Sequence, residues 1–161
     1  MALTKINNNT LSAVTTLPSA IATGKVLQVV SNSYSSNVTT TSTSFVASGY
    51  TTALTPSSTS NKIFIIINGG SVDYDSGTPR IRWKMYADIN GAGYNSINGQ
   101  PINDIKLSVS YSDTISGSFL YSPSTTNAVT IQPYFQSSTG SNVYLNRTFS
   151  TVTVTAMEVA G

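Results

Sequence analysis

Residues 62–68 read KIFIIIN, and residues 80–87 read RIRWKMYA. Side chains along a β-strand point alternately to its two faces. The first stretch is apolar at every position from 63 to 67, which predicts a strand in the middle of a sheet or sandwich. The second alternates basic or tyrosine side chains with apolar ones, so it predicts a strand with one face in the core and the other outside.

Period-two patterns predict further strands elsewhere in the chain. They cover Val26–Val30, Ser44–Tyr50, Ile105–Tyr111, Ile115–Tyr121, Ala128–Phe135, Val143–Phe149 and Val152–Val159. Pro133 indicates a sheet edge or a bulge, and glycine pairs such as Gly69-Gly70 indicate hairpins or loops. No helix is expected. Eight or nine such strands predict an all-β, antiparallel sandwich over residues 25–161, and a jelly roll is built from eight strands in two sheets.

Residues 1–24 differ from this pattern. Apolar side chains recur there at a loosely helical spacing, but the run Asn7–Asn9 and Pro18 oppose a stable helix. One interpretation is a disordered leader. We favour an extended N-terminal arm that attaches to another subunit or to a particle, because regularly spaced leucine and isoleucine would serve no purpose in a free tail. The attachment residues would be Leu3, Ile6, Leu11, Val14, Leu17 and Ile21.

The composition argues against catalysis. The chain has 26 serines and 23 threonines but no histidine, no cysteine and only six acids. Charged residues make up 9%, against about 25% in an ordinary domain. General acid–base chemistry usually uses histidine or a carboxylate with a tuned pKa, and thiol chemistry is excluded. We therefore expect no enzyme, no cofactor and no metal. A net charge of +2 does not favour nucleic acid, and no apolar run is long enough for membrane insertion.

The six acids leave two alternatives open. Asp73–Gly77 and Asp88–Gly91 resemble fragments of a calcium loop, but the bidentate Glu that an EF-hand needs at position twelve is Lys84 when counted from Asp73. Polar turn tips are the simpler interpretation. A glycosidase would need two carboxyl groups about 5–10 Å apart. Most of these acids lie beside turn residues, where aspartate caps the backbone.

Two groups of side chains are candidates for binding. The row Arg80, Arg82 and Lys84 is either a solvated face or a contact for an acidic partner surface or a phosphorylated glycan. A loop with Asn90, Tyr94, Asn95 and Asn98 could contact a glycan. Trp83 shares its face with Ile81 and Met85 and belongs in the core. Tyr50, Tyr94 and Tyr121 lie near turns and are expected to be exposed.

Both ends and one internal phrase carry a resemblance. The openings MALTKINNNTLSAV (1–14) and IATGKVLQVV (21–30), the close STVTVTAMEVAG (150–161) and the phrase TTSTSFVASGYTTALTPSSTSNKIFIII (40–67) resemble small tail-fibre-like and virion surface proteins of bacteriophages, especially phages of cyanobacteria and other marine bacteria. The resemblance covers most of the chain. It lies in the general composition and in short stretches of sequence, and it includes no catalytic signature. It implies a jelly-roll-like sandwich akin to tumour-necrosis-factor-like heads, often trimeric, with an N-terminal part that attaches to a larger particle.

Three functions follow in order of preference. The first is a trimeric capsid decoration or cement protein on the virion surface, assembled in the host cytoplasm and contacting the major capsid protein or other virion proteins. A homotrimer would bury apolar sheet edges. The second is a tail-fibre tip or receptor-binding module for host surface glycan. The third, a glycan-cleaving tail-spike enzyme, is the least favoured because no carboxylate pair stands out.

Overall fold

The computed structural model describes residues 25–97, 103–106, 113–147 and 150–161. Every regular element in these ranges is a strand, which confirms the all-β class. Among the described residues, no helix has the length and hydrophobicity needed to cross a membrane. The strands are β1 (Val26–Tyr34), β2 (Val38–Thr40), β3 (Val46–Ala47), β4 (Thr52–Leu54), β5 (Lys62–Tyr74), β6 (Arg80–Ile89), β7 (Tyr94–Ser96), β8 (Asn103–Lys106), β9 (Asp113–Tyr121), β10 (Val129–Ser137), β11 (Val143–Leu145) and β12 (Val152–Val159).

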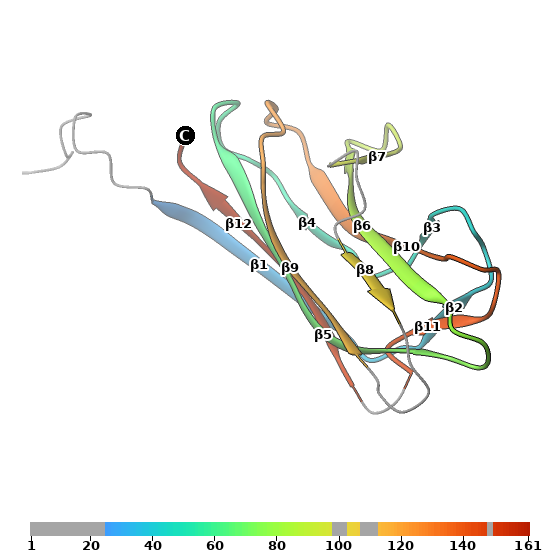
Figure 1. The fold of residues 1–161 in the computed structure, drawn as a ribbon. Coiled ribbons are helices and arrows are strands. Elements are labelled where there is room, and N and C mark those ends of the chain that lie inside the picture. The colour runs from blue at the N-terminus through green and yellow to red at the C-terminus, as the bar shows by residue number, and fades with distance from the viewer. Residues whose placement is uncertain (1–24, 98–102, 107–112, 148–149) are drawn as a thin grey trace, which may run out of the picture.

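Two antiparallel sheets face each other as a sandwich (Figure 1). In the first, which we call the β5 sheet, β1, β12, β5 and β9 lie side by side, and β11 and β2 continue from the distal part of β5. In the second, the β6 sheet, β3 and β4 pair with one side of β10, and β6 pairs with the other; β7 and β8 then pair with β6. First and last strands are neighbours, so both ends of the described fold lie in one sheet.

Strand β5 is central, as its apolar sequence predicts. It pairs with β12 on one side and β9 on the other. The prediction that Gly69-Gly70 marks a loop was wrong, because β5 runs through both glycines to Tyr74. They form a bulge with φ angles of 91° and 73°. A Cβ at residue 69 would overlap the carbonyl oxygen of Thr151. Glycine is therefore used here to bend a continuous strand, not to end it.

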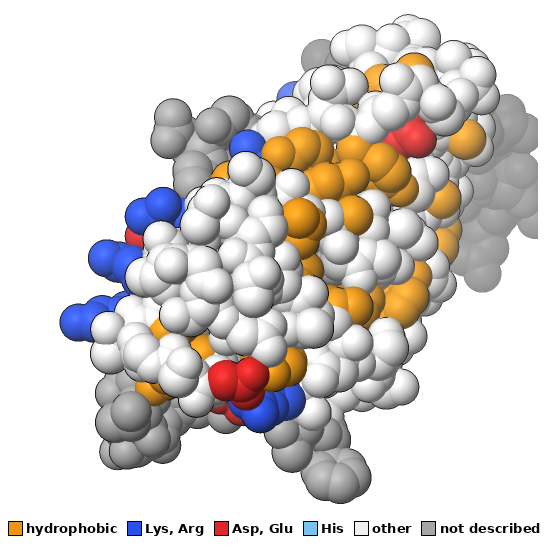
Figure 2. Space-filling model, turned by 90° about the vertical axis from the view of Figure 1, so that its right-hand side faces the viewer, with side chains coloured by type: hydrophobic (Ala, Val, Ile, Leu, Met, Phe, Trp, Pro, Cys, Tyr) orange, Lys and Arg blue, Asp and Glu red, His pale blue; other side chains and the backbone are white. Residues whose placement is uncertain are grey.

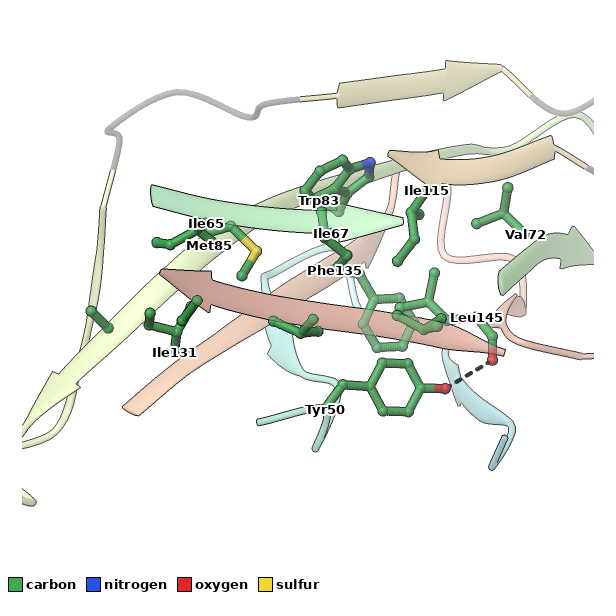
Figure 3. Packing of buried hydrophobic residues seen from close by; sticks show 14 of the residues in the cluster. Tyr50, Ile65, Ile67, Val72, Trp83, Met85, Ile115, Ile131, Phe135 and Leu145 are labelled. Atoms are coloured by element: carbon green, nitrogen blue, oxygen red, sulfur yellow. Dashed lines mark hydrogen bonds between the residues drawn. The ribbon is translucent and has the colours of Figure 1, made fainter. Parts of the chain in front are cut away.

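The core lies between the two sheets. On β6, Ile81, Trp83 and Met85 are fully buried, which confirms the predicted inward face. Figure 3 shows Trp83, Ile67 and Phe135 lying together between strands of both sheets. The Trp83 ring packs edge-on against Phe119, with 6.1 Å between ring centroids. Gly117, beside it on β9, makes room for the indole, because a Cβ there would overlap both rings.

Other strand predictions were only partly right. Strand β10 is an interior strand and keeps its register with β6 through Pro133, so the expected edge or bulge at Pro133 was wrong. The Pro133 carbonyl accepts a hydrogen bond from the Ser48 amide (3.1 Å) in the break between β3 and β4. The ring nitrogen faces the same break, so no ladder hydrogen bond is lost. The break also explains why the predicted strand Ser44–Tyr50 is reduced to Val46–Ala47. Residues 107–111 of the predicted Ile105–Tyr111 strand, and residues 148–149 of Val143–Phe149, lie outside the described residues.

Candidate functional site

The basic row of β6 lies on the outer face of the β6 sheet. Arg80, Arg82 and Lys84 alternate with the buried side chains of the same strand. The Lys84 ammonium nitrogen lies 4.4 Å from the centroid of the Phe45 ring and 5.1 Å from that of Tyr86. A cation over aromatic faces is attracted by their quadrupoles. Lys84 is therefore held against the sheet, and it does not extend freely into water.

Three tyrosines continue this surface. The Tyr86 and Tyr134 rings lie 4.0 Å apart with a 31° angle between their planes. Tyr94 packs on Tyr134 at 5.7 Å. Register explains the contact, because β10 places Tyr134 opposite Lys84 and next to Tyr86 across the ladder. We call Phe45, Arg82, Lys84, Tyr86, Tyr94 and Tyr134 the aromatic–basic face.

Charge on this side of the molecule is mostly positive. Asp104 is shared by two arginines, with its oxygens 2.8 Å from Arg80 Nε and 3.5 Å from Arg82 Nε. In the part of the chain that the structure describes, Lys84 forms no ion pair. Figure 2 shows Lys and Arg side chains projecting from one margin, beside a surface that is mostly neither charged nor hydrophobic. Among the described residues, the aromatic–basic face therefore has one cation without an ion pair, Lys84, next to aromatic rings.

The predicted glycan loop is only partly brought to this face. Tyr94 belongs to it, whereas Asn95 lies opposite the inward-facing Ala87 and donates a hydrogen bond to the Gly93 carbonyl (3.2 Å). Asn90 forms the turn after β6 with a φ angle of 56°. Asn98 lies outside the described residues, as do the six predicted attachment residues of the arm.

Of the three tyrosines expected to be exposed, Tyr50 is buried, and Tyr94 and Tyr121 are half-buried. Tyr50 is 1% exposed, stacks on Tyr34 with 5.1 Å between ring centroids, and donates its hydroxyl proton to the Ser36 carbonyl (2.6 Å). Burial raises the pKa of Tyr50 to about 12. Tyr121 is paired with the inward-facing Ile63 and packs against the core. Gly49 before Tyr50 and Pro123 after Tyr121 indicated turns, but the strand register decided which side the rings face.

A second unusual surface lies on the outer face of the β5 sheet. Val29, Met157, Phe64 and Leu120 are in register across β1, β12, β5 and β9. Val29 is 56% exposed and Leu120 is 57% exposed. Val26 and Leu27, on the same edge strand as Val29, are also exposed. We call Val29, Met157, Phe64 and Leu120 the apolar row.

The acids at the distal end of β5 are held by a cation. Arg147 contacts Asp73 at 3.3 Å and Asp75 at 2.9 Å, and its guanidinium lies 4.2 Å from the Tyr144 ring centroid. Tyr144 and Asn142 donate to Asp75, and these hydrogen bonds, together with Arg147, lower the pKa of Asp75. Both carboxylates therefore belong to a polar cluster at the end of the fold where β5 pairs with β11. Among the described residues, no cluster of three or more potential ligands could hold a metal ion.

A buried carboxylate at the other end was not identified from the sequence. Glu158 is 1% exposed and accepts hydrogen bonds from Ser57 N (2.6 Å), Ser57 Oγ (2.8 Å), Asn61 Nδ2 (2.6 Å) and Gln28 Nε2 (2.6 Å). Burial alone would raise its pKa, but these hydrogen bonds outweigh that effect and lower the pKa of Glu158 to about 2. The network joins β1 and β12 to the turn before β5. Its donors come from distant parts of the chain, so the sequence does not show the network directly. The one available signal was Glu158 itself, a charged residue among the apolar inward-facing positions of β12.

A scan against protein-family models found no match for this chain, and a search of curated proteins found none either.

Proposed function

We propose that the chain is a non-enzymatic structural protein of a bacteriophage particle, and that it decorates the capsid as a homotrimer. The observation that carries this proposal is the apolar row. Isolated exposed apolar residues are normal on a monomer, but here four apolar side chains align across four neighbouring strands. An aligned row of this kind favours a surface that is covered by other copies.

The sheet edges support self-association as well. Among the described residues, β1 pairs only with β12, and β9 pairs only with β5. Each of these edge strands has nine residues and exposed apolar side chains. Long edge strands of this kind are usually covered or blocked in proteins that remain monomeric. A closed cyclic assembly would cover them without producing fibres.

We further propose that the sandwich is a jelly roll of the tumour-necrosis-factor-like kind. If β1 and β2, β12 and β11, β3 and β4, and β7 and β8 each count as one strand position, the order is β1/β2-β12/β11-β5-β9 in one sheet and β3/β4-β10-β6-β7/β8 in the other. That is eight positions, four in each sheet, with early and late strands as neighbours. This arrangement, with the sequence resemblance to small phage surface proteins, supports the proposal.

The arm at residues 1–24 would attach the protein to the capsid shell. It directly precedes β1, whose exposed Val26 and Leu27 continue its apolar character. We expect deletion of residues 1–24 to abolish attachment to the particle while the circular dichroism spectrum keeps its β-sheet form. Unchanged occupancy of the deleted protein on particles would contradict the proposed role of the arm.

The apolar row gives a sharper test of assembly. We expect the full chain to sediment as a trimer, at three times its mass of 17.0 kDa, and the double variant V29S/L120S to sediment as a monomer. Both side chains are exposed, so the fold should survive their replacement. A matched control is A47S/A53S, which changes two exposed alanines on the opposite sheet. A monomeric wild type, or a V29S/L120S trimer as stable as the wild type, would contradict the proposal.

A second candidate is recognition of a host surface glycan, as at a tail-fibre tip. The observation that favours it is the cluster of Tyr86, Tyr94 and Tyr134 on the outer β6 sheet. Tyrosine presents an apolar ring and a polar hydroxyl, which suits a ligand that is wet on one side. The two candidates use different faces, so particle attachment through one leaves the other free.

A further inference from the structure

We propose that the aromatic–basic face binds an acidic glycan, one whose sugar units carry carboxylate or sulfate groups. This inference rests on the glycan-recognition candidate and adds the chemical class of the ligand. It does not depend on trimer assembly. The predicted basic row and the predicted tyrosine loop were separate features of the sequence, and the fold joins them on one surface.

The tyrosines supply the neutral part of the site. Tyr86 and Tyr134 form a tilted pair, and Tyr94 extends it toward the sheet edge. In the described part of the chain, none of their hydroxyl groups has a hydrogen-bond partner. The hydroxyls are not among the buried unsatisfied groups, so they reach solvent. Rings that pack on each other and present free hydroxyls can stack on a sugar ring and bond its hydroxyl groups.

Lys84 supplies the first anion contact. Its ammonium is positioned by Phe45 and Tyr86 and has no carboxylate partner among the described residues. A lysine that is already ordered loses less rotamer freedom when an anion binds. A carboxylate on a sugar stacked over Tyr86 or Tyr134 would therefore meet a cation that is in place before binding.

Arg82 supplies the second anion contact. It lies two residues from Lys84 on the same strand face, about 7 Å along the strand. Its Nε is 3.5 Å from Asp104, at the limit of a hydrogen bond, while Arg80 holds the same carboxylate at 2.8 Å. Within the described residues, the terminal guanidinium nitrogens of Arg82 make no hydrogen bond. They remain able to bind a carboxylate or sulfate in a two-pronged manner.

An acidic glycan fits this face better than an acidic protein does. Protein interfaces usually have an apolar centre surrounded by a polar rim. All the large hydrophobic side chains that are exposed among the described residues lie on β1 or β9, in the other sheet. The aromatic–basic face offers rings, hydroxyls and cations without exposed aliphatic side chains, which is the chemistry of a charged sugar chain. One carboxylate, Asp88, lies at the Tyr94 end of the face and accepts a hydrogen bond from the Gly93 amide (3.0 Å). An acidic group of the glycan would therefore sit at the opposite end, beside Lys84 and Arg82.

Isothermal titration calorimetry of the full chain would test the proposal with three probes at low salt. They are oligogalacturonate, the same oligosaccharide with its carboxylates methyl-esterified, and a sulfated oligogalactan. We expect both acidic probes to bind and the methyl ester to bind at least tenfold more weakly. The variants Lys84→Met and Tyr134→Ala should each weaken binding of the acidic probes at least tenfold. Lys62→Met is the matched control, because it removes the same charge from the β5 sheet.

Each of the other possible results of these titrations would contradict a specific part of the proposal. Equal binding of oligogalacturonate and its ester would leave glycan recognition standing and overturn the acidic class. No binding of any probe would overturn both. Equal losses of affinity from Lys84→Met and Lys62→Met would show that binding depends on the net charge of the protein and not on the position of Lys84. Tighter binding of an oligoglutamate than of oligogalacturonate would assign the face to an acidic protein. If Tyr134→Ala unfolds the protein, Tyr94→Ala at the sheet edge replaces it.

Discussion

Replacing Glu158 by alanine is expected to lower the free energy of unfolding at pH 7 by about 3 kcal/mol or more. The substitution removes a buried acceptor that serves Ser57, Asn61 and Gln28. A buried donor that loses its partner costs about 1–3 kcal/mol, and several are lost together here. Urea denaturation followed by tryptophan fluorescence would measure the change, since the sole tryptophan is in the core.

Glu158→Gln is the matched control. The glutamine keeps one oxygen for Ser57 and Asn61 but places an amino group against Gln28 Nε2, which also donates to the Thr55 carbonyl (2.7 Å). We expect a smaller loss, about 1–2 kcal/mol. A Glu158→Ala protein as stable as the wild type would contradict the structural role of this network.

The same network predicts how stability depends on pH. Glu158 has a pKa of about 2 in the folded protein and an ordinary value of 4.5. The folded state therefore binds this proton less readily than the unfolded state. Its stabilising contribution is complete above about pH 4.5 and is lost as the pH falls toward 2. The stability advantage of wild type over Glu158→Gln should shrink across this window. An advantage that stays constant down to pH 2 would show that the carboxylate is not stabilised in its charged form.

The second large effect is expected at the bulge of β5. Gly69→Ala should lower the free energy of unfolding by about 3–4 kcal/mol. Residue 69 has a φ of 91° and its Cβ would overlap a backbone carbonyl, that of Thr151. Strain at positive φ contributes about 1–3 kcal/mol, and overpacking contributes a similar amount. Thermal denaturation would detect the loss directly.

Gly91→Ala separates these two causes. Gly91 also has a positive φ, 76°, but no atom lies within 4 Å of its hypothetical Cβ. We therefore expect a loss of about 1 kcal/mol from backbone strain alone. Similar losses at both positions would mean that close packing against β12 does not explain why residue 69 is glycine.

The conformation of Gly69-Gly70 in the structure shows what the sequence could and could not predict. The continuous apolar run of residues 63–67 correctly indicated a central strand, and the alternation along residues 80–87 correctly indicated a half-buried one, because burial follows the pattern of the side chains. Gly69-Gly70 looked like a turn, since glycine permits both a turn and a bulge. The bulge is fixed by Thr151, which directly precedes β12, and by Val152, the first residue of β12. Both residues are far from Gly69 in the sequence, so the local sequence does not reveal them.

The proposed binding surfaces also depend on contacts between strands. The basic row was visible because it lies on one strand. Its tyrosine neighbours were not, because Tyr134 and Tyr94 reach it through the register of β10 and β7 with β6. The apolar row similarly takes one residue from each of four strands. Surfaces assembled across strands depend on pairing and register, which are long-range properties.

Location on the particle is the central claim, and immunogold electron microscopy of purified phage particles tests it most directly. An antibody against this chain should label the particle head over its whole surface. Label confined to the tail would contradict capsid decoration and favour the glycan-recognition candidate. Particles without any label would contradict the proposal that this β-sandwich is a virion protein.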